Sequence, residues 1–144
     1  MESGDLHVTT QQRLKNMDWL LKDLAVTVPR TRHIVLLSAD GLCMAQWGAG
    51  KDAADRLAAA SSGLKSLAQS VAAEFPHSDG GVRMVVLEVD GGFFYLMAAA
   101  ANSYLAVTAD EGVDAGLMSQ RMRDLVIRIG DHLASPPRAP EQAP

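Results

Sequence analysis

Residues 33–47 read HIVLLSADGLCMAQW, and this stretch decides the fold. It opens with a continuous apolar run over residues 33–38, which predicts a buried strand. Asp40 and Gly41 follow, and both residue types tolerate the positive φ angles of a tight hairpin turn. Residues 42–47 then supply the returning strand. The stretch therefore predicts two neighbouring antiparallel strands.

Helices are predicted on both sides of this hairpin. Residues 9–28 begin with a threonine suited to an N-cap and carry apolar residues at helical spacing until Pro29. Residues 52–75 form the second helix, for which Asp52 is the expected cap. Asp114 opens a third helix with one apolar face.

Three more strands complete the predicted fold. They cover residues 82–89, 93–100 and 104–109, and glycine, aspartate or asparagine marks the turns at residues 90–92 and 102–103. The element order is therefore α-β-β-α-β-β-β-α. An α+β protein with a five-stranded antiparallel sheet, covered by helices, satisfies this order.

The composition is that of one soluble globular domain. The chain has 144 residues, of which 48% are hydrophobic and 21% charged. We expect the domain to span residues 9–134, between a disordered N-terminus at residues 1–8 and a disordered proline-rich tail at residues 135–144. Cys43 is the only cysteine, which excludes a disulfide framework and suits a reducing compartment.

Charge and hydropathy exclude two classes of partner. The net charge of −4 argues against nucleic acid, because phosphate binding needs a clustered excess of Lys and Arg. No apolar run approaches the ~20 residues that cross a bilayer, and the first residues lack the apolar core of a signal peptide. We expect a cytoplasmic protein without an integral membrane segment.

No motif for catalysis or metal binding stands out. His7, His33, His77 and His132 fall in four separate segments, and none belongs to a metal-binding H-E-x-x-H pattern. Cys43 lies among apolar neighbours in a predicted strand, where a buried thiol is the usual occupant. We therefore predict no catalytic residue, no metal site and no cofactor.

The second helix has an unusual row of small residues, with larger apolar residues around it. The small row includes Ala54, Ala58, Ala59, Ser62, Gly63, Ser66 and Ser70, and the larger residues are Leu57, Leu64, Leu67, Val71 and Phe75. Small side chains let another backbone approach closely. Two interpretations stay open: the helix packs tightly on its own sheet, or it packs against the same helix of a second copy.

The strand at residues 82–89 is a candidate edge strand. It follows the long crossover helix, is mostly apolar and carries only Arg83 and Glu88 as charges. A bare edge of this kind recruits other chains, and pairing with its own copy would remove that hazard. Pairing centred between the two charges would set Arg83 near Glu88 of the partner subunit. The predicted homodimer interface comprises Ala58, Ala59, Ser62, Gly63, Ser66, Ser70, Arg83, Val85 and Leu87.

The chain resembles the Roadblock/dynein light-chain family, most closely its actinobacterial conservon type. Three stretches carry the resemblance: MDWLLKDLAVTVPRTRHIVLLSADGLCMA (17–45), LAAASSGLKSLAQSVAAEF (57–75) and VRMVVLEVDGGFFYLMAA (82–99). The most specific motifs are the L-S-x-D-G hairpin at residues 37–41 and the closing G-x-H-L-x-x-P-P at residues 130–137.

The resemblance implies a profilin-like or longin-like fold, with one helix on one face of the sheet and two on the other. It also implies dimerisation through the second helix and the third strand. Bacterial members typically bind small Ras-like GTPases, and conservon operons also encode a sensor-kinase-like protein, which is therefore implied as a further partner. One bacterial relative activates its GTPase without contributing a catalytic residue, so none is assigned here.

The sequence thus favours a non-enzymatic, homodimeric regulator or scaffold of a Ras-like GTPase in bacterial signalling. The polar positions Arg56, Lys65 and Gln69 flank the small row and are the expected docking residues. An alternative is a small-molecule sensor, in which the aromatic residues 93–95 line an apolar pocket. A third hypothesis is a hydrolase whose site is assembled from scattered residues.

Overall fold

The computed structural model describes residues 17–77 and 81–134. Its strands are β1 (Thr31–Ser38), β2 (Cys43–Trp47), β3 (Met84–Val89), β4 (Gly92–Ala99) and β5 (Ser103–Asp110), and its helices include α2 (Gly50–Ala72) and α3 (Ala115–Ala134). An N-terminal helix covers residues 17–27 of the described part. The predicted cap of that helix and the two predicted disordered ends lie outside the described residues.

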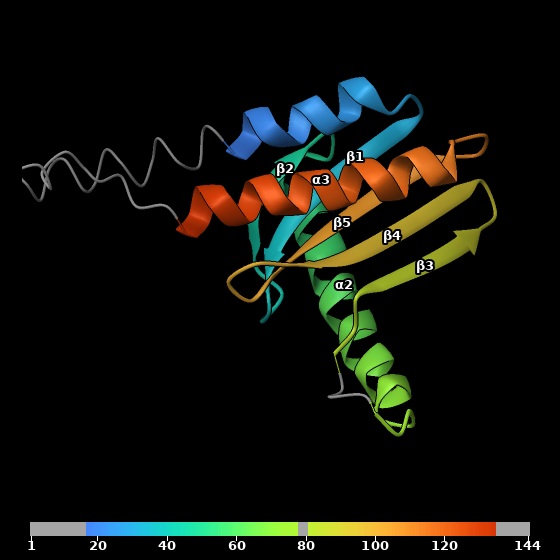
Figure 1. Ribbon diagram of the computed structural model, residues 1–144. Coiled ribbons are helices and arrows are strands. Elements are labelled where there is room, and N and C mark those ends of the chain that lie inside the picture. The colour runs from blue at the N-terminus through green and yellow to red at the C-terminus, as the bar shows by residue number, and fades with distance from the viewer. Residues whose placement is uncertain (1–16, 78–80, 135–144) are drawn as a thin grey trace, which may run out of the picture.

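The five strands form one antiparallel sheet in the order β2-β1-β5-β4-β3 (Figure 1). The predicted element order and antiparallel pairing are therefore confirmed. The long crossover through α2 carries the chain from β2 at one edge of the sheet to β3 at the opposite edge. The prediction that this strand lies at an edge is also correct.

Helices cover the sheet as expected, with two on one face and one on the other. Leu36 and Leu105 point into a core beneath the N-terminal helix and α3, which we call the α3 face. Val35 and Ala106, their neighbours along β1 and β5, point to the opposite side, the α2 face. Successive side chains of a strand alternate between faces, so each strand contributes to both cores.

The hairpin between β1 and β2 has the turn that its sequence predicts. Gly41 has a φ of +87°, a conformation that glycine adopts without steric cost. Its N–H donates to the Ser38 carbonyl oxygen at 2.9 Å, and the Ser38 hydroxyl donates to the Asp40 carboxylate. A side chain at Gly41 would also meet the Cβ of Ser62 at 3.2 Å, so this turn lies directly against α2.

The start of α2 differs from the prediction. The helix begins at Gly50, and Asp52 lies in its first turn instead of capping it. The Gln46 side-chain oxygen accepts hydrogen bonds from the N–H groups of Ala49 and Gly50, at 2.9 and 3.1 Å. A glutamine of strand β2 therefore satisfies the free N–H groups that a cap would serve.

Two further boundaries were predicted a few residues away from their observed positions. The second helix ends at Ala72, because the N–H of Phe75 turns back to the carbonyl of Ala72 in a tighter winding. The β4–β5 turn is made by Ala101 and Asn102, both with a φ of 58°, instead of by residues 102 and 103.

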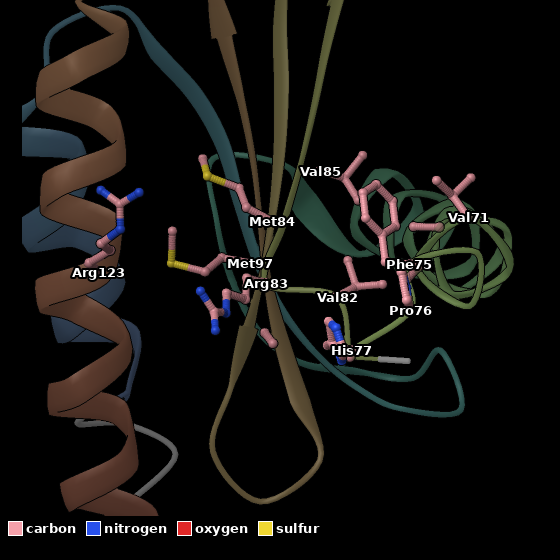
Figure 2. A pocket seen from close by; sticks show the side chains of 14 residues that line it. Val71, Phe75, Pro76, His77, Val82, Arg83, Met84, Val85, Met97 and Arg123 are labelled. Atoms are coloured by element: carbon pink, nitrogen blue, oxygen red, sulfur yellow. The ribbon is translucent and has the colours of Figure 1, made fainter. Parts of the chain in front are cut away.

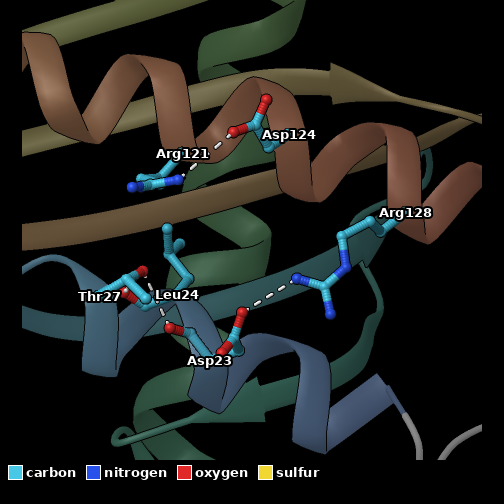
Figure 3. A network of polar contacts seen from close by, with 6 residues as sticks. All are labelled: Asp23, Leu24, Thr27, Arg121, Asp124 and Arg128. Atoms are coloured by element: carbon cyan, nitrogen blue, oxygen red, sulfur yellow. Dashed lines mark hydrogen bonds and ion pairs between the residues drawn. The ribbon is translucent and has the colours of Figure 1, made fainter.

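The third helix begins as predicted, and it lies beside the N-terminal helix. The Asp114 carboxylate accepts a hydrogen bond from the Leu117 N–H at 3.0 Å, which is a side-chain cap. Further along, Arg128 pairs with Asp23 of the N-terminal helix at 2.9 Å, as Figure 3 shows. Arg121 and Arg128 of α3 are thus both paired with aspartates.

Candidate interaction surface

The first half of α2 packs tightly on its own sheet. Ala54, Ala58 and Ser61 are fully buried, and the two alanines belong to the core on the α2 face. The Ser62 hydroxyl donates to the carbonyl of Ala39 in the hairpin turn at 3.4 Å. For this half, the interpretation of close packing within one chain is correct. Ala58 was predicted at the dimer interface, but its buried side chain has no surface to offer a partner.

The second half of α2 projects beyond the sheet, together with the turn that follows it (Figure 1). We call residues 66–77 the overhang. Three large apolar side chains lie exposed there, Leu67, Val71 and Phe75, at 68%, 63% and 62% of their full accessible surface. They recur at every fourth residue, so they form one stripe along the helix. Exposed apolar groups gathered in this way mark an interaction surface.

The edge strand β3 is bare on the same face of the sheet. Val85 and Leu87 are paired with Leu96 and Phe94 of β4, which belong to the core on the α2 face. Leu87 and Val89 are nevertheless exposed, because α2 lies over the β2, β1 and β5 side of the sheet. The described chain therefore leaves this part of the sheet uncovered.

A groove of about 1520 Å³ runs from the overhang, around the beginning of β3, to Met97 of β4 and Arg123 of α3. Figure 2 shows Val71 and Phe75 on one side of it and Val82 and Val85 opposite them. The apolar stripe of the helix and the apolar strand edge thus face one shared hollow. A second apolar element would complete the packing on both.

The outward side of α2 carries most of the predicted small row. Ala59, Gly63, Ser66 and Ser70 are all exposed. A Cβ added at Gly63 would meet no atom of the described residues within 4 Å. No contact among the described residues therefore requires glycine at position 63. The outward side is a smooth strip without large side chains, and we call these four residues the platform.

The three predicted docking residues do not form one patch. Arg56 and Gln69 are exposed. Lys65 donates to the carbonyl of Ala39 at 3.3 Å and lies 5.3 Å from the ring centre of Tyr104, so it is held by its own chain. Arg56 and Lys65 are nine positions apart, which places them on opposite sides of an α-helix. One flat partner surface cannot contact both.

The observed strand register also limits how β3 can pair with its own copy. Met84, Val86 and Glu88 alternate with Val85 and Leu87 on the two faces. In an antiparallel pair of identical strands, the two-fold axis is perpendicular to the sheet, and opposite residues share a face. Opposed positions must then both be odd or both be even. A centre midway between Arg83 and Glu88 breaks this rule, whereas a centre at Val86 satisfies it.

Of the histidines and the cysteine singled out in the sequence, His33 and Cys43 lie in the sheet, whereas His7 lies outside the described residues. Nδ1 of His33 lies 2.9 Å from the Thr108 hydroxyl across β1 and β5, and burial and then Arg32 lower the pKa of this imidazole. Burial and then Asp55 raise the pKa of the half-buried Cys43 thiol, which keeps it protonated.

The described part of the chain also contains no group of three or more His, Cys, Asp or Glu placed to hold a metal ion. Among these same residues, no helix is long and apolar enough to span a bilayer.

The aromatic residues 93–95 do not line the groove. Tyr95 lies in the core beneath α3, and Phe94 lies in the core beneath α2. Phe93 packs against the first of these cores and stacks on Tyr95, with 6.1 Å between ring centres. These residues are therefore core residues, and the groove beside the overhang is lined by other residues of β3, β4 and α3.

Sequence reasoning missed the residues that are most exposed in this surface. Leu67, Val71 and Phe75 were interpreted as apolar surroundings of the small row. Their spacing was visible, but a helical stripe normally faces the chain's own core. Only the angle and length of α2, which carry these residues past the sheet, show that they lack a cover.

The chain is similar to several known proteins. The sequence model of the Roadblock/LC7 domain matches residues 17–109, well over half of the chain. A solved Roadblock/LC7 domain from Streptomyces avermitilis is 39% identical and has a TM-score of 0.76, covering 82% of this chain and 98% of that one.

Two more distant structures share the fold. The gliding protein MglB from Thermus thermophilus is 15% identical and has a TM-score of 0.74, covering 83% of this chain and 90% of its own. A structure of MglB in a tetrameric arrangement is 14% identical and has a TM-score of 0.75, covering 83% and 89%. At these identities the likeness shows the fold alone. The search of curated proteins gave no match.

Proposed function

The chain belongs to the Roadblock/LC7 family, and we propose from this premise that two copies pair through α2 and β3 to form a regulator of a small Ras-like GTPase. The observation that carries the proposal is the exposed apolar stripe of Leu67, Val71 and Phe75 beside the bare edge of β3. A second copy supplies a complementary surface of the same kind, because a two-fold pair buries one patch against itself.

The proposed pairing covers both unpartnered surfaces at once. Strand β3 meets its copy in antiparallel register, with Val86 at or beside the two-fold axis, and the two sheets become one. The overhang of each α2 then lies over the groove of the other copy. Of the predicted interface residues we keep Val85 and Leu87, which lie on the face that the helix would cover.

The two α2 helices of such a pair would present their outward sides together. The platform (Ala59, Gly63, Ser66 and Ser70) has no bulky group, so a partner can approach the helix backbone closely. We place the GTPase on this composite surface, with Arg56 and Gln69 as its polar contacts. The pair acts by binding, without a catalytic group of its own. A sensor-kinase-like partner and a cytoplasmic location complete the proposal.

A binding experiment with a charge-reversed variant tests the placement of the GTPase. A small Ras-like GTPase is loaded with GDP or with a GTP analogue and titrated into the wild-type protein. We expect Arg56→Glu to weaken binding about fivefold, because a charge at a rim changes affinity by about 1 kcal/mol. The matched control is Arg123→Glu, which changes an exposed arginine of α3 on the opposite face.

The outcomes separate the parts of the proposal. Binding that weakens in Arg56→Glu and not in Arg123→Glu supports the platform. Equal affinity of both variants and the wild type would show that the GTPase binds elsewhere. No binding in either nucleotide state would remove the GTPase from the proposal altogether.

A further inference from the structure

A second unpartnered surface lies on the opposite face of the sheet. It is made by Arg83, which precedes β3, by Arg123 of α3, and by the methionines Met84 and Met97 (Figure 2). Figure 2 shows these four side chains on the α3 side of the strands, away from Val71 and Phe75. We call this group the arginine site.

The floor of the arginine site is apolar and adaptable. Met97 is almost fully buried and Met84 is half-buried, and both pack on the core beneath α3. Val86 extends this floor along β3, because it lies on the α3 face opposite Tyr95 and is half-exposed. Methionine side chains adjust to differently shaped apolar partners, which favours them at binding surfaces.

The two arginines have no acidic partner among the residues that the structure describes. The ion pairs there engage Arg32, Lys51, Arg121 and Arg128, and neither Arg83 nor Arg123 takes part in one. This contrast is marked on α3, where Arg121 and Arg128 on one side are both paired with aspartates. In a chain with a net charge of −4, two unneutralised guanidinium groups over an apolar floor indicate an anionic ligand.

We propose that the arginine site binds an acidic, amphipathic segment of a partner protein, with its carboxylates on Arg83 and Arg123 and its apolar side chains on Met84, Met97 and Val86. Arginine holds a carboxylate through two parallel hydrogen bonds, and the methionine floor would contact aliphatic groups beside it. Both parts of the site are thus accounted for by one ligand.

A peptide fits this surface better than a membrane or a nucleotide does. The site is recessed between α3 and β3, so a flat bilayer would not reach its floor. A free nucleotide would need a stacking surface, whereas the floor here is aliphatic.

The arginine site is complete within one chain, so it does not depend on the proposed dimer. Pairing of β3 with its copy about Val86 consumes the strand edge and covers the α2 face, and on the α3 face it sets Met84 opposite Glu88 of the partner subunit, beside the arginine site. The two sites would then lie beside each other along the joined sheet. The proposed GTPase platform is on the other face, so one protein could hold both partners at the same time.

Peptide display tests the proposal without a known partner. A library of random 12-residue peptides is selected on the immobilised wild-type protein, and the enriched peptides are titrated into the wild type and three variants. The variants are Arg83→Ala, Arg123→Ala and the control Lys22→Ala, which removes an exposed positive charge of the N-terminal helix. Thermal unfolding and sedimentation of each variant report whether its fold and its self-association are retained.

We expect the enriched peptides to combine Asp or Glu with Leu, Met or Ile. Each of Arg83→Ala and Arg123→Ala should weaken their binding roughly tenfold to a hundredfold, as expected for a lost charge-assisted hydrogen bond. The affinity of Lys22→Ala should equal that of the wild type. Because the exposed charges are screened, binding should also weaken as salt is added.

Three results would overturn the proposal. They are an absence of enriched peptides, enriched peptides without acidic residues, and acidic peptides that bind the Arg83 and Arg123 variants as well as the wild type. A loss of self-association in Arg83→Ala alone, with peptide binding retained, would assign that arginine to the dimer instead. GTPase binding is measured separately on Arg56→Glu, so failure here leaves the proposed function untouched.

Discussion

Val71→Ala is the substitution that tests the proposed dimer most quantitatively. Val71 is 63% exposed in the single chain and lines the groove that the second copy would fill. The change removes two carbon atoms, each worth about 0.8 kcal/mol when fully buried. Scaled by the exposed fraction, the loss is about 1 kcal/mol per copy. The residue occurs twice in a two-fold pair, so the dimer loses about 2 kcal/mol and its dissociation constant rises about thirtyfold.

Val26→Ala is a closely matched control. Val26 is 70% exposed on the N-terminal helix, at the α3 face, and it also changes from valine to alanine in a helix. Any gain in helix propensity is therefore the same in both variants. Analytical ultracentrifugation over a concentration series gives the dissociation constant of each. The reasoning is refuted when Val71→Ala and Val26→Ala dissociate at the same concentration as the wild type.

Four further predictions concern the single chain. Gly63→Ala should raise the free energy of unfolding of the monomer by up to about 1 kcal/mol, since its methyl group meets open space in a helix. Gly92→Ala should instead lower this free energy by more than about 2 kcal/mol, because its Cβ would lie 2.1 Å from the Ala109 carbonyl oxygen. Urea titration compares the free energies of unfolding of the two variants. Equal stability of the two variants would contradict both predictions. Cys43 should react with iodoacetamide at pH 8 more slowly than glutathione does, since burial raises the pKa of its thiol. Unfolding the protein in urea should abolish this difference. A native protein that reacts faster than glutathione would contradict the burial of the thiol. The pKa of His33 is lower in the folded protein than in the unfolded chain, so the unfolded chain takes up a proton more readily. The contribution of the neutral His33 side chain to the free energy of unfolding is therefore complete above the unfolded pKa of about 6.5. This contribution is lost as the pH falls below that value. His33→Gln should therefore lose less stability than the wild type between pH 7 and pH 5, and an identical loss would refute the assignment.

Local signals in the sequence were sufficient for the order of elements. Asp40 and Gly41 fix a hairpin because their backbone conformation is needed there, and Asp114 caps α3 through its own carboxylate. These features depend on residues within a few positions of one another. Any chain with the same local sequence would favour them, so no knowledge of the tertiary structure was required.

Features that depend on distant packing were predicted less well. Gln46 supports the start of α2 from a neighbouring strand, and glutamine before a helix carries no capping signal of its own. Lys65 was predicted to be a docking residue, and its contacts with the hairpin turn and Tyr104 could not be predicted from its place on the helix. In both cases the deciding partner comes from an element whose position only the folded chain defines.

The small row on α2 shows why the candidate site was predicted only in part. One sequence pattern serves two purposes: Ala54 and Ala58 fit against the sheet, whereas Gly63 and Ser70 face outward. A helix of 23 residues is longer than the sheet it covers, so the same periodicity continues past the core. Spacing alone cannot tell where the covered half ends.

The distance between the two copies of β3 tests the central claim most directly. Val86→Cys in a Cys43→Ser background provides one labelling site per chain, and a spin label at residue 86 reports its separation from the same label on a second copy. Paired strands lie about 5 Å apart, so the account predicts one short distance, limited by the two label linkers. The same label at Ile127→Cys, on the outer side of α3, should give a longer distance. The account would be contradicted if the labelled Val86→Cys variant sedimented as the wild type does but its spin-label signal showed no short distance between two copies.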